Sequence, residues 1–492
     1  MFTLLTIFFL QFVNKAGSDI VCLSPIALEM REKRGIAIDS LDYAVSPLYL
    51  DSISRLGAEV LHTSRWFNGA TVEANEQTIQ SIKQCTFVDT IYLTRTDEES
   101  SVIPPLSLRK REVIIGEGQE AKGERQEAKG ERLEAKGEEL EAKGEELEQL
   151  AQLNLLPLHQ AGYKGQGIRV GIADGGFYNA DSLESLPHDQ WLGYTDLTDS
   201  QHDFFGPEGN HGTLCLSAIM GQQENYQGAA TQAEYFLFRT EEHNTESPKE
   251  IDNWVAAIEM ADSLGLHIVS TSLGYTTFDQ EHFNFAYDDM DGHTSRGAQA
   301  SLIAARKGML LVTAMGNEGN KDWHYLSTPA DADSILSVGA VNQDGQAGIF
   351  SSFGPSADGR VKPEVCAMGE GTALINPADN TLIKGNGTSF ACPLIAGMAA
   401  SLWSALPNAT NMEIREIILR SCDRYNQPDM QLGYGIPDVW KAYTSITTHL
   451  PSTLHSTPYT KILDNGQLYI LYNGIKYNLL GHRIKCEEIY TK

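Results

Sequence analysis

The chain has 492 residues, of which 41% are apolar, and its formal net charge is −28. This length suits about three domains, and the apolar fraction allows a large buried core. The acidic balance argues against a nucleic-acid partner, because binding to phosphates needs a basic face. The seven cysteines are scattered and odd in number, so they predict neither a disulfide framework nor a metal site.

Residues 1–18 are predicted to be a signal peptide. An apolar run from Thr3 to Val13 has the length of a signal-peptide core, and the small residues at positions 16–18 suit cleavage. The run is too short to span a bilayer comfortably, and no later segment is long and apolar enough for a transmembrane helix. The alternative is a buried N-terminal strand, since no Lys or Arg precedes the run.

Residues 19–115 alternate short apolar stretches with turns and predict a small α/β domain. A linker is predicted at 116–149, where the heptapeptide EAKGE(R/E)(Q/L) occurs four times between Glu120 and Leu147. Each copy carries a glycine, which costs about 1 kcal/mol in a helix, and too few apolar residues to bury a core. The linker is therefore expected to be solvated and easily cut.

Residues 150–447 alternate apolar strands with helical patterns. The strands IRVGIAD, AEYFLFRT, HIVSTSLG, MLLVTAMG and ILSVGAV are apolar on both faces, as in a parallel sheet covered by helices on both sides. We expect an α/β domain of three layers. The tail, residues 448–492, has Asn-Gly turns between strand-like runs and is expected to form β-hairpins.

Four polar residues lie where strands end or helices begin. Asp174 and Asn317 follow strands, and His211 and Ser389 open apolar helices, each beside glycines. Active sites of parallel sheets lie at the carboxyl ends of strands. A histidine can activate a serine hydroxyl, an aspartate can orient that histidine, and a backbone N–H with an Asn amide can stabilise an oxyanion. These residue types predict acyl transfer.

The order Asp, His, Ser and the surrounding residues resemble the subtilisin-like serine peptidases, or subtilases. The matching stretches within residues 150–443 are VGIADGG, GNHGT, STSLGY, VTAMGNEGN, VKPEVCAMG, NGTSFACPLIAG and LGYGIPD. The resemblance implies that Asp174, His211 and Ser389 form a catalytic triad and that Asn317 completes the oxyanion hole. It also implies two substrate-binding segments, one pairing with the substrate backbone and one lining the pocket for the residue before the scissile bond: Ser272, Leu273 and Gly274, and Ala314, Met315 and Gly316.

Some positions depart from the family pattern. Gly175 stands where Ser or Thr is usual after the aspartate, which leaves every catalytic group in place. Met315 replaces a smaller residue and is expected to narrow the pocket. We expect the substrate side chain that enters this pocket to be apolar or uncharged. Pro329 falls where many subtilases have a cis-proline. No cofactor is required, and the absence of a contiguous calcium loop leaves calcium binding open.

The N-terminal region resembles the propeptides of secreted subtilases from Bacteroidetes-type bacteria. This resemblance implies a zymogen whose propeptide inhibits the enzyme, with polypeptide substrates and a location outside the cell, at its surface or in the periplasm of a bacterium. Two alternatives remain open. One is a catalytically silent subtilase-like binding protein at the cell surface. The other is a transpeptidase, which shares the chemistry up to the acyl-enzyme.

Overall fold

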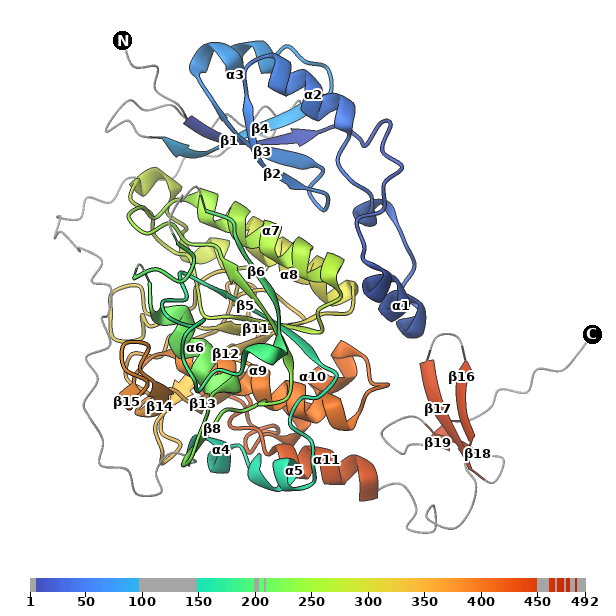
Figure 1. The fold of residues 1–492 in the computed structure, drawn as a ribbon, viewed down its shortest axis with the longest axis vertical. Coiled ribbons are helices and arrows are strands. Elements are labelled where there is room, and N and C mark those ends of the chain that lie inside the picture. Colours follow the sequence, from blue (N-terminus) through green and yellow to red (C-terminus); the bar gives the residue numbers. More distant parts are fainter. Residues whose placement is uncertain are drawn as a thin grey trace, which may run out of the picture.

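The computed structural model describes residues 6–96, 148–198, 203–207 and 209–448, and four strands between residues 460 and 484 (Figure 1). The described chain forms a small N-terminal domain, a large α/β domain and a C-terminal sheet. The repeat from Glu120 to Leu147 lies outside the described residues.

The N-terminal domain is a four-stranded antiparallel sheet with α2 (Pro47–Arg55) and α3 (Glu76–Ile82) on one face, whereas α1 (Pro25–Arg34) lies away from the sheet. In spatial order its strands are β2 (Glu59–Ser64), β3 (Gly69–Ala74), β1 (Thr6–Phe12) and β4 (Val88–Thr96). Buried apolar side chains from β1, β3, α2 and α3 form a core separate from that of the large domain.

The prediction of a signal peptide at residues 1–18 rested on an apolar run, and the structure places that run inside the N-terminal sheet. Residues Thr6–Phe12 form an inner strand that pairs with β3 on one side and β4 on the other. Leu10 is fully buried, and Phe9 and Phe12 are 3% exposed. A strand covered on both faces is a continuous apolar run, which cannot be told from a signal-peptide core by composition alone. The N-terminal domain therefore includes Thr6 and does not begin at residue 19.

The large domain is built on a seven-stranded sheet in which every pair of neighbouring strands is parallel, which confirms the predicted architecture. In spatial order the strands are β13 (Val365–Met368), β12 (Leu336–Val341), β11 (Leu310–Ala314), β10 (Ile268–Thr271), β5 (Arg169–Asp174), β9 (Glu234–Arg239) and β6 (Trp191–Asp196). Two short antiparallel pairs accompany it, β7 (Gln222–Gln223) with β8 (Tyr226–Gln227), and β14 (Thr372–Ile375) with β15 (Leu382–Gly385).

Helices cover both faces of this sheet, because alternate strand residues are apolar in both directions. Along β5, Val170 and Ile172 pack into the core on one face, and Ala173 packs into the core on the other. The first face carries α4 (Glu148–Gln152), α5 (Leu156–Gln160), α6 (His211–Met220), α9 (Thr388–Ala405), α10 (Asn411–Ser421) and α11 (Val439–Thr448). The second face carries α7 (Pro248–Leu264) and α8 (Arg296–Arg306).

Helix α9 is the central helix of the first face. By length and composition α9 is long and apolar enough to cross a membrane, which corrects the expectation that no segment after the N-terminal run has this character; among the described residues it is the one such helix. Of its most apolar window, 89% is buried inside the protein. Its apolar character is accounted for by its contacts with α6 and with the strands β10 to β13.

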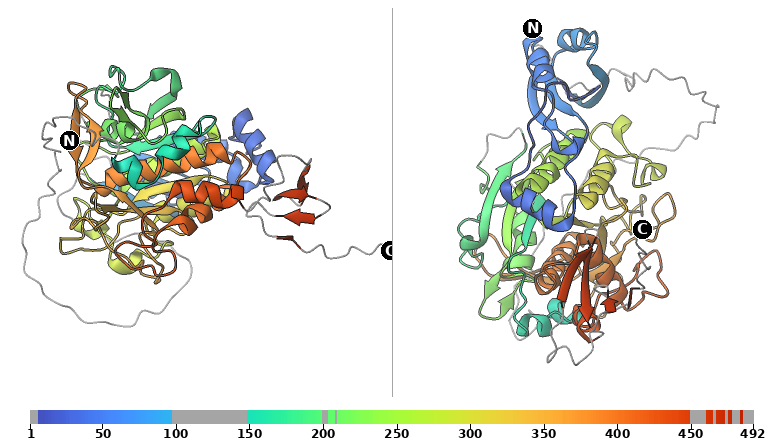
Figure 2. Two further views of the ribbon diagram at one scale, coloured as in Figure 1. Left: turned by 90° about the horizontal axis from the view of Figure 1, so that it is seen from below. Right: turned by 90° about the vertical axis from the view of Figure 1, so that its right-hand side faces the viewer.

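The N-terminal domain docks on α7 through its sheet, and α1 lies farther along the large domain (Figures 1 and 2). The contact contains buried ion pairs. Arg31 and Arg65 donate to Asp262 of α7 at 2.7 and 2.5 Å, and Lys307 donates to Asp42 at 2.8 Å. Buried charges are stable only when paired, so this interface is specific for the two surfaces that form it.

The C-terminal strands form an antiparallel sheet, as the hairpin prediction required. They are β16 (Thr460–Asp464), β17 (Gln467–Tyr472), β18 (Ile475–Tyr477) and β19 (Arg483–Ile484), paired in sequence order. The peptide bond between Thr328 and Pro329 is cis, the form expected at that position by resemblance.

Candidate active site

The four residues predicted to carry the chemistry lie at element ends. Asp174 is the last residue of β5, and Asn317 follows the end of β11. His211 is the first residue of α6, and Ser389 is the second residue of α9. Strands β5 and β11 are both neighbours of β10, so their carboxyl ends lie at one edge of the sheet.

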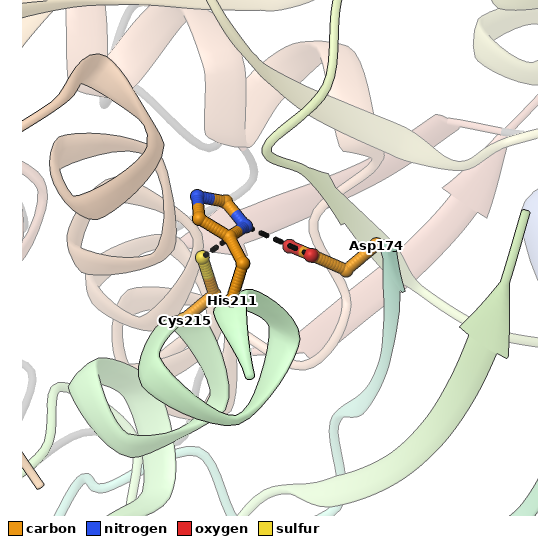
Figure 3. A group of neighbouring side chains, drawn as sticks. All are labelled: Asp174, His211 and Cys215. Atoms are coloured by element: carbon orange, nitrogen blue, oxygen red, sulfur yellow. Dashed lines mark hydrogen bonds and ion pairs between the residues drawn. The ribbon is translucent and has the colours of Figure 1, made fainter. Parts of the chain in front are cut away.

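Asp174 and His211 are hydrogen-bonded (Figure 3). The Nδ1 atom of His211 lies 2.8 Å from Oδ1 of Asp174, which also accepts the N–H of Gly175 at 2.8 Å. Asp174 is fully buried, whereas the His211 side chain is 38% exposed. Burial by itself would lower the pKa of His211, but the charge of Asp174 outweighs it and raises this pKa well above its usual value. The carboxylate therefore both orients the ring and stabilises its charged form.

Ser389 is held between α6 and the segment after β10. Its hydroxyl donates to the carbonyl oxygen of Ser272 at 3.3 Å, and the Ser272 hydroxyl donates to the Ser389 carbonyl oxygen at 2.8 Å. The thiol of Cys215, one turn after His211 on α6, also donates to that carbonyl at 3.3 Å. The ring of Phe390 lies 5.7 Å from the ring of His211, centre to centre. Ser389 thus lies beside the Asp174–His211 pair, with its hydroxyl turned towards Ser272.

The side-chain amide of Asn317 has a fixed orientation. Its Oδ1 atom accepts the N–H of Thr388 at 2.9 Å and the Thr388 hydroxyl at 3.0 Å. Its Nδ2 atom lies 3.8 Å from where a Cβ would stand on Gly387. Because the oxygen is engaged, the NH₂ group remains a donor beside the N-terminus of α9, where the backbone nitrogen of Ser389 lies 3.7 Å from the same Cβ position.

The two predicted substrate segments lie on either side of Ser327. A Cβ on Gly274 would stand 2.0 Å from the Ser327 hydroxyl oxygen. A Cβ on Gly316 would stand 3.2 Å from the same oxygen and 3.0 Å from the hydroxyl oxygen of Ser352. Gly274 is exposed, and Ser272 is 7% exposed. A larger residue at either position would therefore collide with these serines and shift the backbone of its segment.

Met315 departs from the expectation that it narrows the pocket. Its side chain is fully buried in a cluster with Met290, Leu326 and Ala330. Ala314 is 2% exposed, so within this segment Gly316 is the residue with partly accessible surface. Successive side chains at the end of β11 point in opposite directions. The packing of the neighbouring segments, and not the local sequence, decides that Met315 points into the protein.

The structure adds a cysteine that sequence reasoning left out. The Sγ atom of Cys215 is 3.8 Å from Nδ1 of His211, and this thiol is fully buried. Residues four apart share one face of a helix, so the spacing of His211 and Cys215 contained this signal.

A group of acidic residues also lies near Asp174. The carboxylates of Glu241, Glu246 and Glu250 are within 4.8 Å of one another, and Glu241 lies beside Gly175. Burial, followed by the neighbouring carboxylates, raises the pKa of Glu241 to about 8.

Comparison with known families matches both domains. Residues 165–435 match the model of the subtilase family, and residues 9–103 match that of the peptidase S8 propeptide domain of Bacteroidota. The propeptide match includes part of β1, in agreement with its place in the N-terminal sheet. Members of the subtilase family need no cofactor for catalysis.

Individual relatives are peptidases. The chain is 27% identical over 280 residues to a thermostable alkaline protease of Halalkalibacterium halodurans, covering 56% of this chain and 68% of the relative. It is 26% identical over 296 residues to subtilisin E of Bacillus subtilis, covering 60% and 70%. It is 27% identical over 296 residues to the minor extracellular protease Epr of Bacillus subtilis, covering 58% and 40%.

Among solved structures, the MycP3 protease from the type VII (ESX-3) secretion system has a similar fold. It superposes with a TM-score of 0.50 at 21% identity, covering 62% of this chain and 91% of that one. The family model spans more than half of the present chain. It includes the ends of β5 and β11 and the starts of α6 and α9, where Asp174, Asn317, His211 and Ser389 lie. The chain therefore belongs to the subtilase family of serine endopeptidases.

Proposed function

We propose that the protein is a secreted serine endopeptidase, made as a zymogen, in which Asp174, His211 and Ser389 form the triad. The observation that carries this proposal is the 2.8 Å hydrogen bond between Asp174 and His211, formed beside a serine at the N-terminus of a buried helix. Asp174 accepts the Nδ1 proton of His211, so in the neutral ring Nε2 carries the lone pair and acts as the base, and the raised pKa of His211 makes it a stronger one.

The chemistry follows from these positions. Oγ of Ser389 attacks the carbonyl carbon of the scissile bond while Nε2 of His211 takes the hydroxyl proton. For this step the hydroxyl turns away from the Ser272 carbonyl. The oxyanion is stabilised by the N–H of Ser389 and by Nδ2 of Asn317, which is oriented by Thr388. His211 then protonates the leaving amine, and water releases the acyl group.

Substrate binding is assigned to the two segments near Ser327. We infer that residues 272–274 pair with the substrate backbone as an added strand, since Gly274 is exposed at the carboxyl end of β10. Residues 314–316 line the pocket for the residue before the scissile bond through Gly316 and the backbone. The buried Met315 side chain supports the floor of this pocket from beneath.

The N-terminal domain is proposed to be the inhibitor of the same chain. Its match to a propeptide family and its docking on α7 support this role. We place the domain at residues 6–115, the linker at 116–149, the peptidase domain at 150–447 and the tail at 448–492. The relative named as an extracellular protease supports export, with the cell surface or periplasm as the other locations.

A catalytically silent binding protein is disfavoured, because the groups needed for catalysis are all present and Asp174 and His211 are hydrogen-bonded. A transpeptidase is not favoured either, since the relatives reported above are proteases. No step of the mechanism uses calcium.

Labelling with a fluorophosphonate tests the proposal. Wild-type protein should be labelled, Ser389→Ala should not, and the matched Ser404→Ala variant, on the same helix, should be labelled like the wild type. N-terminal sequencing should find cleavage within about residues 97–147, the segment between the two domains. If wild-type protein is not labelled even after the N-terminal domain has been removed, the peptidase proposal is wrong.

A further inference from the structure

We propose that Ser327 closes the pocket for the residue before the scissile bond, so that the enzyme cuts after residues with short, uncharged side chains such as alanine and serine. This inference rests on the proposed function, because it takes residues 272–274 and 314–316 as the two walls of that pocket. Ser327 belongs to neither wall. The structure places its hydroxyl next to a glycine of each wall.

The backbone around Ser327 is tied to both walls. Its N–H donates to the carbonyl oxygen of Met315, in one wall, at 3.2 Å. The next residue, Thr328, exchanges two backbone hydrogen bonds with Tyr275, which directly follows the other wall, at 2.8 and 3.2 Å. Main-chain contacts therefore hold Ser327 between the walls, and these contacts do not depend on its side chain.

The hydroxyl of Ser327 points towards the glycines of both walls. From the position of a Cβ on Gly274, the Oγ atom of Ser327 is 2.0 Å away and its Cβ atom is 2.9 Å away. From the corresponding position on Gly316, Oγ is 3.2 Å away and Cβ is 3.8 Å away. The oxygen is thus nearer than the carbon to both glycines. Glycines leave room for close approach of a ligand, and here the Ser327 hydroxyl takes up part of that room.

The surroundings of Ser327 are closely packed. The Ser352 hydroxyl oxygen stands 3.0 Å from the Cβ position of Gly316 and accepts the N–H of Glu318 at 3.0 Å. Ser327 is 4% exposed and Ser352 is fully buried. Met315 is also fully buried, in an apolar cluster. A long substrate side chain would have to displace these atoms, and overpacking of this kind is unfavourable.

The charge of the pocket favours a neutral side chain. Ser327 and Ser352, which close it, are uncharged. Glu318 follows the second wall by two positions, and its carboxylate accepts a hydrogen bond from Lys321 at 3.0 Å. The side chains of this pair are 27% and 57% exposed, so the pair lies at the protein surface. A charged substrate side chain that entered the pocket would lose its hydration without gaining a charged partner.

The test compares serine variants of the processed enzyme. Fluorophosphonate labelling first gives the concentration of active sites in each preparation. Each enzyme then digests a mixture of denatured proteins, and mass spectrometry identifies the residue before each cut. The best-cut sequence is synthesised with Ala, Ser, Leu or Phe at that residue. These peptides compete in one reaction, which gives their relative kcat/KM values.

The matched control is Ser185→Gly. Ser185 is 3% exposed and lies between β5 and β6, where its hydroxyl accepts a hydrogen bond from the Gln223 amide at 2.8 Å, outside both walls. We expect the wild type and this control to cut after Ala and Ser at least about tenfold faster than after Leu or Phe, because one methylene changes kcat/KM by about ten- to 200-fold.

Ser327→Gly removes the hydroxyl and should raise the kcat/KM of the Leu and Phe peptides relative to the Ala peptide at least about tenfold. Ser327→Ala should change this ratio less but in the same direction, since its Cβ atom remains 2.9 Å from the Cβ position of Gly274. The alanine variant serves as the test if the glycine variant does not fold.

A wild-type enzyme that is labelled but cuts after Phe as readily as after Ala would overturn the inference and leave the peptidase function intact. An unchanged ratio in the Ser327 variants would do the same. Absence of labelling, or labelling without any cut, would refute the proposed function, and this inference would fall with it. The two proposals therefore fail at different steps of the experiment.

Discussion

The carboxylate of Asp262 connects the N-terminal domain to the peptidase domain, and its removal should loosen that contact strongly. Asp262 lies in the last turn of α7. It accepts hydrogen bonds from Arg31 at 2.7 and 2.8 Å and from Arg65 at 2.5 Å. The three side chains are between 3% and 7% exposed. Asp262→Asn keeps the shape but leaves two buried guanidinium groups without this negative charge.

The magnitude follows from burial. Removing one partner of a buried ion pair costs about 3–5 kcal/mol. Arg31 keeps Asp42 at 3.1 Å, which places the expected loss near the lower end, at about 3 kcal/mol. At roughly 1.4 kcal/mol per factor of ten, the N-terminal domain should open about 150-fold more often.

Hydrogen exchange measures this opening in the full-length protein. The chain carries Ser389→Ala to prevent self-cleavage. Exchange is followed by mass spectrometry at the amides of Arg65 and Trp66, which donate to Glu259 of α7 across the contact. The matched control is Asp51→Asn, which breaks a pair with Arg55 in which the side chains are 55% and 78% exposed. An exposed pair contributes less than about 1 kcal/mol, so this control should exchange within about fivefold of the parent. If Asp262→Asn exchanges no faster than Asp51→Asn, the buried ion pairs do not hold the domain.

Three further changes test other parts of the structure. Burial lowers the pKa of His159 to about 4 and that of His267 to about 3. As the pH falls below about 6.5, the unfolded chain takes up these protons before the folded chain does. The free energy of unfolding therefore falls, by about 3 kcal/mol for each histidine at pH 4. Denaturant titrations at pH 7 and pH 4 should show a loss about 3 kcal/mol smaller for His159→Gln than for wild type, and an equal loss would contradict this account. Asn317→Ala should lower kcat on a peptide substrate by about 10²- to 10³-fold with little change in KM, and a loss below about tenfold would remove Asn317 from the oxyanion hole. Gly274→Ala should raise KM, because its Cβ would stand 2.0 Å from the Ser327 hydroxyl oxygen, and the added change Ser327→Gly should restore KM if this contact is the cause.

Much of the large domain follows from local sequence. Strands such as residues 169–174 are apolar on both faces, and a strand of that kind is stable only in a sheet covered on both sides. The positions of Asp174 and Asn317 after strands, and of His211 and Ser389 at helix starts, are also local facts. Parallel strands bring such ends to one edge of the sheet, so the candidate site could be predicted before any distance was known.

The N-terminal run shows where local sequence is insufficient. Residues 6–12 are apolar enough for a signal-peptide core and equally for an inner strand. The choice is made by pairing with residues 69–74 and 88–96, which lie far along the chain. Composition measures the preference of a segment for an apolar environment, and it does not name the segment that provides that environment.

Side-chain direction and charge pairing were decided by the tertiary structure alone. Met315 is buried because Met290 and Leu326 pack around it. Arg31 and Asp262 are 231 positions apart and meet because the N-terminal domain docks on α7. The sequence by itself therefore determined the elements, their order and the residues at their ends, since these depend on near neighbours. Contacts between distant residues depend on how complete surfaces fit together, and only the folded chain determines that fit.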